Sequence, residues 1–192
     1  SIVVFSGSSP CIETDFIFPY GIDLANKYDK ISILDTYGNH LQSCIDKAPT
    51  VLHNNIDEIN CSLNKNINST EDKIEFLNYL YNKGIKLAYL TDGEKEFYCS
   101  KFNFHYKINP QNIKAVDSTG SGDAFVAGIA YGMEKDLVFN EFTQIASALG
   151  IVNAQSWKTC NFAIEEIESL SKEIVVEPVG KKMKIIDDSP TI

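Results

Sequence analysis

Short apolar runs alternate with longer segments of helical periodicity along the first half of this chain, and this alternation limits the folds available to it. The runs are typical of buried strands, and we expect strands over residues 2–5, 30–36, 49–53 and 85–91. Between the last two, Ile74, Leu77 and Tyr81 share one helical face, and Gly84 is placed to end that helix. Alternating strands and helices predict βαβ units and a mostly parallel sheet, so the expected fold class is α/β.

The second half of the chain shows a different order of elements. Asp92-Gly93 is a strong turn signal, and a hairpin is expected over residues 95–108. Residues 123–133 are apolar on all sides, which predicts a helix buried on all sides. Two further helical stripes cover 142–152 and 164–170, and a last strand covers 173–177. Residues 179–192 read as a polar tail that follows an α/β part of residues 1–178.

Charge and cysteine usage limit the partners of this protein. The chain has 17 Lys and Arg against 26 Asp and Glu, and no basic cluster, so no nucleic-acid partner is expected. No apolar run approaches the roughly 20 residues of a membrane span, so no membrane partner is expected either. The five cysteines are dispersed without C-x-x-C spacing, which fits a reducing cytoplasm and argues against a disulfide framework or a zinc site.

The stretch AVDSTGSGDAFVAG places Gly120, Ser121 and Gly122 directly before Asp123. One interpretation is a tight turn in which Asp123 caps the following helix. The other is phosphoryl transfer, in which loop amides at a helix N-terminus hold an anion and Asp123 takes a proton from an attacking hydroxyl. In that case Gly122 is expected to have an unusual dihedral or to approach the phosphate closely. A dinucleotide loop is excluded because Phe125 replaces the third glycine, and a Walker loop because no GK[ST] follows.

The segment DSTGSGDAFVAG closely resembles the D-T-x-G-A-G-D signature of the ribokinase/PfkB family of carbohydrate kinases. The resemblance implies a three-layer ribokinase-like fold, with ATP and Mg²⁺ as cofactors. It also implies transfer of a phosphoryl group to a hydroxyl of a sugar or sugar phosphate. In that family the final Asp, here Asp123, is the catalytic base, and Gly120, Ser121 and Gly122 would supply the anion hole.

Two segments near the N-terminus resemble the phosphosugar branch of the same family, which includes 1-phosphofructokinase and tagatose-6-phosphate kinase. SGSSP resembles its GSLP turn, and ILDTYG resembles its ILDTSG. The resemblance implies substrate contacts at Gly7, Ser8 and Asp35, and an acceptor of the fructose 1-phosphate or tagatose 6-phosphate type. A nucleoside kinase of the same fold is an alternative.

Three further segments imply the nucleotide and metal sites. Thr91-Asp92-Gly93 resembles the family's T-L-G turn near the nucleotide phosphates, and residues 148–153 resemble its late helix, whose Asn lies near the base and ribose. HNNIDE resembles K-P-N-x-x-E, a motif tied to magnesium and phosphate. The implied nucleotide-binding residues are Thr91, Gly93, Asn55 and Asn153, and the implied metal-site residues are Asn55 and Glu58. Taken alone, Asn55 and Glu58 fit a helix cap equally well.

Two positions depart from the family pattern. His53 stands where the family has a lysine, and Glu96 stands where it has the second glycine of T-L-G-x-x-G, so the nucleotide site has lost a fixed positive charge and gained an acid. These departures favour a second alternative, a regulatory paralogue that binds nucleotide or sugar without turnover.

The resemblance covers residues 2–176 and begins partway through the family's fold. We therefore expect the C-terminal nucleotide-binding part of a kinase, with the N-terminal part and the lid outside this chain. The strand at residues 2–5 is then an exposed apolar edge, which favours self-association, for instance as a homodimer.

Overall fold

The computed structural model describes residues 1–110 and 114–180. The chain forms two compact units, one made of residues 1–92 and 98–105 and the other of residues 93–97 and 106–192. None of the helices in the described ranges combines the length and the apolar composition that a membrane crossing requires.

The first unit is built on four parallel strands that follow one another in chain order. They are β1 (Ile2–Ser6), β2 (Ile31–Asp35), β3 (Val51–Asn55) and β4 (Leu87–Thr91). β5 (Phe97–Lys101) runs antiparallel to β4, with Leu87 opposite Lys101. The predicted strands are thus confirmed, and so is a mostly parallel sheet of an α/β fold.

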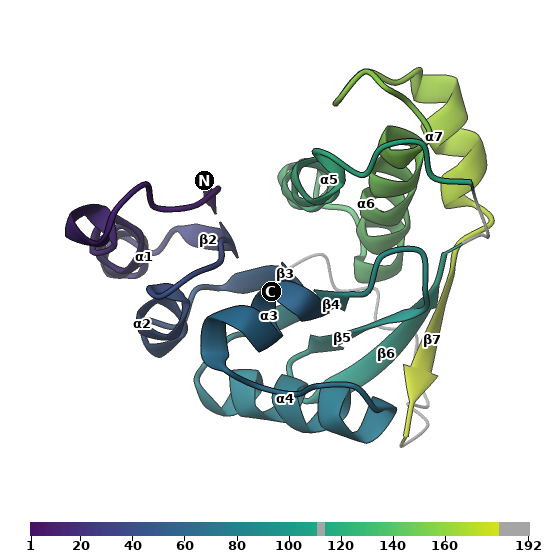
Figure 1. The fold of residues 1–192 in the computed structure, drawn as a ribbon. Helices are drawn as coiled ribbons and strands as arrows, with labels where there is room; N and C mark the ends of the chain where they lie inside the picture. The colour runs from purple at the N-terminus through teal and green to yellow at the C-terminus, as the bar shows by residue number, and fades with distance from the viewer. Residues whose placement is uncertain (111–113, 181–192) are drawn as a thin grey trace. The chain divides into compact units, whose positions relative to one another are not determined.

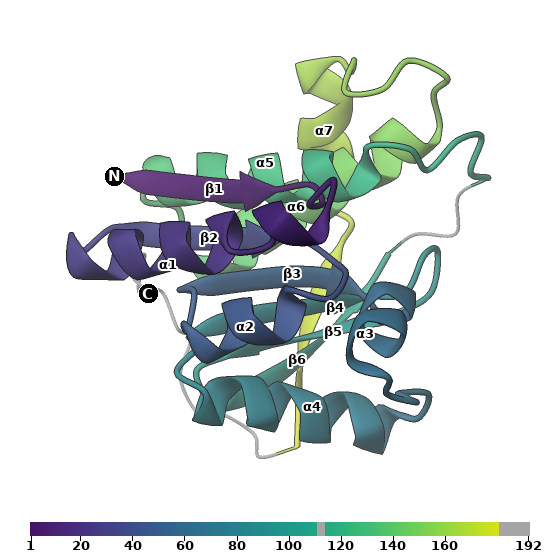
Figure 2. The same cartoon turned by 60° about the vertical axis from the view of Figure 1, so that its left-hand side comes forward.

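Each connection between the parallel strands contains at least one helix. These are α1 (Ile17–Lys27), α2 (Leu41–Asp46), and the pair α3 (Ile56–Leu63) and α4 (Thr70–Asn82). Right-handed crossovers that all advance in one direction place their helices on one face of the sheet, and α1 to α4 lie along one face of these strands (Figures 1 and 2). The carboxyl ends of the strands therefore meet at one edge, where ligands bind in folds of this kind.

Local sequence explains where these helices begin and end. Pro19 lies in the first turn of α1, where its missing N–H would have no intrahelical acceptor in any case. Ser69 and Asp72 form a capping box at the start of α4. Gly84, with φ of +99°, follows the last residue of that helical segment in a left-handed conformation, as predicted from the sequence.

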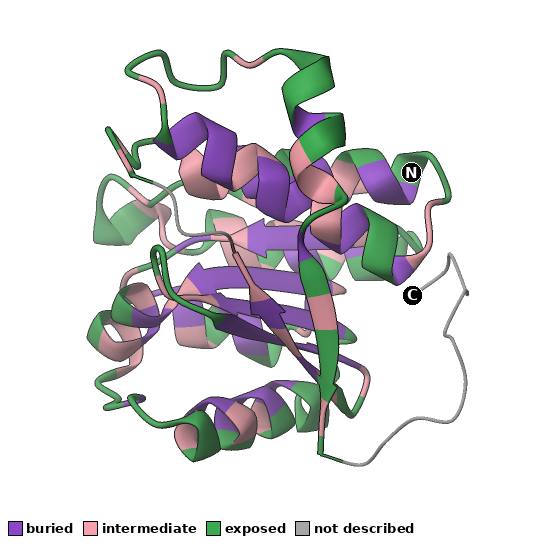
Figure 3. Cartoon of the chain, turned by 90° about the vertical axis from the view of Figure 1, so that its right-hand side faces the viewer, coloured by how far each residue is buried: buried purple, intermediate pink, exposed green. Residues whose placement is uncertain are grey.

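The second unit contains three helices and two strands in its described part. They are α5 (Ser121–Glu134), α6 (Phe139–Ala154), α7 (Ile164–Ser171), β6 (Phe104–Asn109), which begins in the first unit, and β7 (Val175–Val179). α5 and α6 pack closely, because a Cβ on Gly128 of α5 would lie 2.5 Å from the Cα of Ala146 on α6. Buried residues, purple in Figure 3, line the faces through which α5 and α6 contact each other, and they also cover much of the sheet.

Two predictions about these elements are wrong in detail. α5 is not buried on all sides, since Ala127 and Tyr131 are exposed on the same stripe as Asp123. Alanine and tyrosine tolerate water, so an apolar pattern did not require full burial. β7 reaches Val179, the first residue of the predicted polar tail; residues 181–192 lie outside the described residues.

Candidate active site

The glycine loop forms the N-terminus of α5. Gly120 is the N-cap residue and has φ of +78°, a left-handed conformation that favours glycine. The amide of Ser121 donates to the carbonyl of Ser118 at 3.0 Å, which closes the turn before the helix. Gly122 and Asp123 follow in the first helical turn, where amides have no intrahelical acceptor and the helix dipole favours an anion. The backbone of the loop could therefore hold an anion at the first-turn amides of α5.

Asp123 does not cap the helix, so the capping interpretation of this residue is wrong. It lies three positions after the N-cap Gly120, and it is exposed. A carboxylate at this position stands beside the first-turn amides without occupying the N-cap, where its oxygens would satisfy them. Such an arrangement can receive a proton from a hydroxyl held near the loop.

The expectation of an unusual dihedral belongs to Gly120 and not to Gly122. Gly122 lies within α5 and is not among the glycines with positive φ. At Gly120 a Cβ would also collide with the methyl group of Thr159. The segment after α6 therefore packs directly against the N-cap of α5.

Asn153 holds this loop in place from the end of α6. Its side chain is 1% exposed, and its amide nitrogen donates to the carbonyl of Thr119 at 2.8 Å and to the hydroxyl of Ser121 at 3.0 Å. Its amide oxygen accepts from the backbone N–H of Cys160 at 2.7 Å. The resemblance suggested a nucleotide contact for Asn153, and this supporting role was missed. A lone Asn at a core position of an apolar helix was the available signal.

The start of the loop is fixed by Asp117. Its carboxylate accepts from the backbone N–H of Thr119 at 2.9 Å. This backbone hydrogen bond is the main reason that the pKa of Asp117 lies below its usual value. The backbone N–H of Thr119, at the start of the glycine loop, therefore already has a hydrogen-bond acceptor.

In the first unit, the turn after β1 is tied to the end of β2. Gly7 has φ of +97°, its amide donates to the carbonyl of Asp35 at 3.0 Å, and its carbonyl accepts from the hydroxyl of Thr36 at 2.6 Å. His40, through its Nε2, lies 2.8 Å from the same hydroxyl. The structure therefore brings Gly7 and Asp35 together at one sheet edge, with Ser8 exposed next to them.

Asn55 and Glu58 form the capping box of α3. Oδ1 of Asn55 accepts from the amide of Glu58 at 2.8 Å, and Oε2 of Glu58 accepts from the amide of Asn55 at 3.0 Å. The helix-cap interpretation is thus confirmed, while the second carboxylate oxygen of Glu58 takes no part in the box. Among the described residues no group of three or more His, Cys, Asp or Glu side chains is arranged to hold a metal. A single carboxylate oxygen can serve a Mg²⁺ ion whose remaining ligands are oxygens of phosphate and water.

The residue after β4 is held by a lysine. Nζ of Lys73, a buried residue of α4, lies 2.9 Å from a carboxylate oxygen of Asp92. Thr91 precedes it and directs its hydroxyl toward Nε2 of His53, 3.3 Å away.

In the second unit Gly93 has φ of +61°, and Glu96 has a cationic neighbour, since Nζ of Lys107 lies 3.4 Å from its carboxylate. The acid that replaces the family's glycine is therefore partly compensated.

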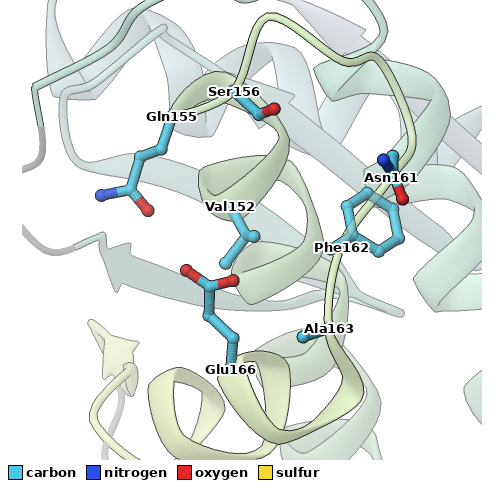
Figure 4. A pocket seen from close by; sticks show the side chains of 7 residues that line it. All are labelled: Val152, Gln155, Ser156, Asn161, Phe162, Ala163 and Glu166. Carbon is cyan, nitrogen blue, oxygen red and sulfur yellow. The ribbon is translucent and has the colours of Figure 1, made fainter.

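A pocket of about 400 Å³ lies beside α6 and α7 in the second unit (Figure 4). Val152 of α6 and Glu166 of α7 line it, together with residues of the segment between the two helices. None of the residues predicted for the site lines this pocket.

The pfkB family carbohydrate kinase model matches residues 15–166, a range that includes the glycine loop and the capping box of α3. The chain belongs to the pfkB family of carbohydrate kinases. It is 31% identical over 180 residues to a tagatose-6-phosphate kinase from Staphylococcus epidermidis, a match that covers 91% of this chain and 57% of that protein.

Solved structures of other proteins have the same fold as this pfkB chain. Phosphofructokinase-2 from Escherichia coli matches with a TM-score of 0.81 and 18% identity, over 90% of this chain and 56% of that one. A possible 1-phosphofructokinase from Thermotoga maritima matches with a TM-score of 0.82 and 20% identity, over 93% and 57% of the two chains. The ribokinase-like fold is thus confirmed. The chain spans less than two thirds of the length of these relatives.

Proposed function

We propose that this pfkB chain is the nucleotide-binding part of an ATP-dependent kinase of sugar phosphates. The observation that carries the proposal is the left-handed Gly120 N-cap at the start of α5, followed in the first turn by the exposed Asp123. Membership of a carbohydrate kinase family supports phosphotransfer as the reaction. The similarity to a tagatose-6-phosphate kinase supports an acceptor of the tagatose 6-phosphate or fructose 1-phosphate type.

In this proposal the residues of the glycine loop stabilise charge and accept a proton. Asp123 accepts the proton of the acceptor hydroxyl while the hydroxyl oxygen bonds to the γ-phosphorus of ATP. The bond from that phosphorus to the bridging oxygen breaks, and ADP leaves. The first-turn amides of α5 stabilise the negative charge on the transferring group, because they are oriented before the reaction begins.

Further roles, implied by the family resemblance, are proposed for Gly93 and for residues at the strand ends of the first unit. Asn55 and Glu58 would hold the metal, with the carboxylate oxygen of Glu58 that takes no part in the capping box as the protein ligand. Mg²⁺ neutralises phosphate charge when it is bound. Thr91 and Gly93 bind nucleotide phosphates, and Gly7, Ser8 and Asp35 bind the acceptor.

A regulatory paralogue without turnover is the second candidate. One observation favours it: the side chain at the family's lysine position, His53, is only 4% exposed and lies against Asp35, so it does not extend a cation into solvent. The intact sequence Gly120-Ser121-Gly122-Asp123 favours the kinase, since a binder has no need of the base.

An assay of wild-type and Asp123→Asn protein distinguishes these candidates. ADP release is measured with tagatose 6-phosphate, fructose 1-phosphate and adenosine as acceptors, and ATP affinity is measured by calorimetry. We expect turnover with a sugar phosphate, a loss of about 10²- to 10⁴-fold in the variant, and unchanged ATP affinity. ATP binding without turnover in the wild-type protein would support the regulatory paralogue, and turnover with adenosine alone would support a nucleoside kinase.

A further inference from the structure

The side chains of Asp35, His53 and Thr91 lie next to one another on three neighbouring parallel strands, with Asp35 and Thr91 at the strand ends and His53 two residues before the end of β3. In the β2–β3 register Leu34 is opposite Leu52, and the next step places Asp35 beside His53. In the β3–β4 register His53 is opposite Tyr89. Side chains two residues apart on a strand share a face, so Thr91 lies on the face of the sheet that carries His53.

The imidazole of His53 bridges its two neighbours. Nδ1 lies 3.1 Å from a carboxylate oxygen of Asp35, and Nε2 lies 3.3 Å from the hydroxyl oxygen of Thr91. An ionised carboxylate can only accept, so Nδ1 carries the proton of that hydrogen bond. Nε2 and the carbonyl oxygen of Asn54, which lies 3.5 Å from the hydroxyl of Thr91, are the two acceptors within reach of that hydroxyl. Each ring nitrogen is thus engaged by a residue of a different strand.

This arrangement gives His53 a role different from that of a flexible cation. A lysine side chain can extend its charge toward a phosphate, whereas the His53 ring is 4% exposed and is held at both nitrogens. The ring connects Asp35, assigned above to the acceptor side, with Thr91, assigned to the nucleotide side. Because the ring contacts both side chains, a ligand that fixes the position of Asp35 also restricts Thr91, so that less order remains to be gained when the second ligand binds.

We propose that His53 is a positioning residue that couples acceptor binding at Asp35 to nucleotide binding at Thr91. The proposal rests on the kinase function proposed above. Binding of either ligand holds one end of the bridge, and the hydrogen bonds through the ring hold the other end. Because such coupling is reciprocal, the acceptor raises nucleotide affinity by the same factor by which the nucleotide raises acceptor affinity.

Two substitutions remove the hydrogen bonds one at a time. The amide of Asn reaches approximately to the position of Nδ1, so His53→Asn keeps the contact with Asp35 and loses the contact with Thr91. The longer Gln reaches approximately to the position of Nε2, so His53→Gln keeps only the contact with Thr91. His105→Gln, at a histidine of β6 outside the site, is the matched control.

The test measures the affinity of the full-length protein for a non-hydrolysable ATP analogue with and without saturating tagatose 6-phosphate or fructose 1-phosphate. The ratio of the two dissociation constants is the coupling factor. We expect a factor of about 5- to 150-fold in the wild type and in His105→Gln. We expect a factor near one in both His53 variants, and thermal unfolding of each variant checks that it is folded.

The outcomes separate this inference from the function on which it rests. If the wild-type protein binds both ligands but the His53 variants keep its coupling factor, or the wild type shows a factor of one, the inference is wrong and the proposed function stands. If the wild-type protein binds neither the analogue nor any sugar phosphate, the proposed function fails and the inference fails with it. If one of the two His53 variants unfolds, the other still tests the inference, because each removes one of the two hydrogen bonds that the coupling requires.

Discussion

At the residue scale, Gly120 and Gly122 have different structural requirements although both belong to the glycine loop. We predict that Gly120→Ala destabilises the protein by about 1–3 kcal/mol, because it forces a positive φ on alanine and a collision with Thr159. Gly122→Ala is the control: Gly122 lies within α5 and has no positive φ, so we expect the stability to be unchanged or slightly higher. Urea unfolding measures both.

Activity measurements distinguish two explanations for Gly122, a close approach of phosphate to its backbone and an ordinary helical turn. If phosphate approaches its backbone closely, Gly122→Ala lowers kcat/KM while the free energy of unfolding stays the same. Equal destabilisation by the two alanine substitutions would contradict the distinction between the glycines.

The sequence predicted candidate site residues by type and order but not the contacts that their side chains make. The glycine loop, Asp123 and the Asn55–Glu58 pair are local patterns, and each lies where its pattern placed it relative to a helix N-terminus. The contacts of His53 with Asp35 and Thr91, and of Asn153 with Thr119, join residues distant in the chain. Local periodicity contains no information on such pairs, because they depend on strand register and on packing.

At the scale of the element, the first unit has two capping boxes, and only one lies at the predicted metal site. We predict that Asn55→Ala, at α3, and Ser69→Ala, at α4, each cost about 0.5–2 kcal/mol of stability. Only Asn55→Ala should raise the Mg²⁺ concentration needed for half-maximal turnover, because only that box includes Glu58. The measurements are urea unfolding and a Mg²⁺ titration of ADP release; equal Mg²⁺ dependence in the two variants would contradict the metal assignment.

Elements were predicted well where a pattern had a clear period, and less well at their ends. The strands of the first unit and α4 follow from apolar runs and one helical stripe. α6 begins at Phe139, three residues before the predicted 142–152 stripe, and continues to Ala154. Ends depend on capping and on tertiary contacts, and the N-cap of α6, Val138, makes no side-chain cap hydrogen bond that could mark it.

At the scale of the whole molecule, β1 presents an open sheet edge in the described part of the chain. It pairs with β2 on one side, and Val4 is 44% exposed. Nearby residues of α1, Ile17 and Tyr20, are also exposed apolar side chains. An unpaired apolar strand edge is a template for another strand.

We predict that the polypeptide of residues 1–192 self-associates, and that Val4→Lys reduces this association. A charge on an exposed edge strand opposes pairing with a second strand. The control is Ile164→Lys at the exposed Ile164 of the helix α7, which should leave the mass unchanged. Analytical ultracentrifugation at several concentrations gives the mass; a monomer at all of them, or equal effects of the two lysines, would contradict the assignment of the β1 edge.

The hydrogen bonds of Asn153 also have a consequence for local unfolding. They connect the last turn of α6 to a loop 34 residues earlier in the chain, so that neither segment can leave its place while the other keeps these bonds. Fraying of a helix end is ordinarily a low-energy event that concerns only that helix. Here we expect it to release the glycine loop as well, so that the two segments open together. The backbone amides of the glycine loop and of the C-terminal end of α6 should then exchange with solvent at similar rates.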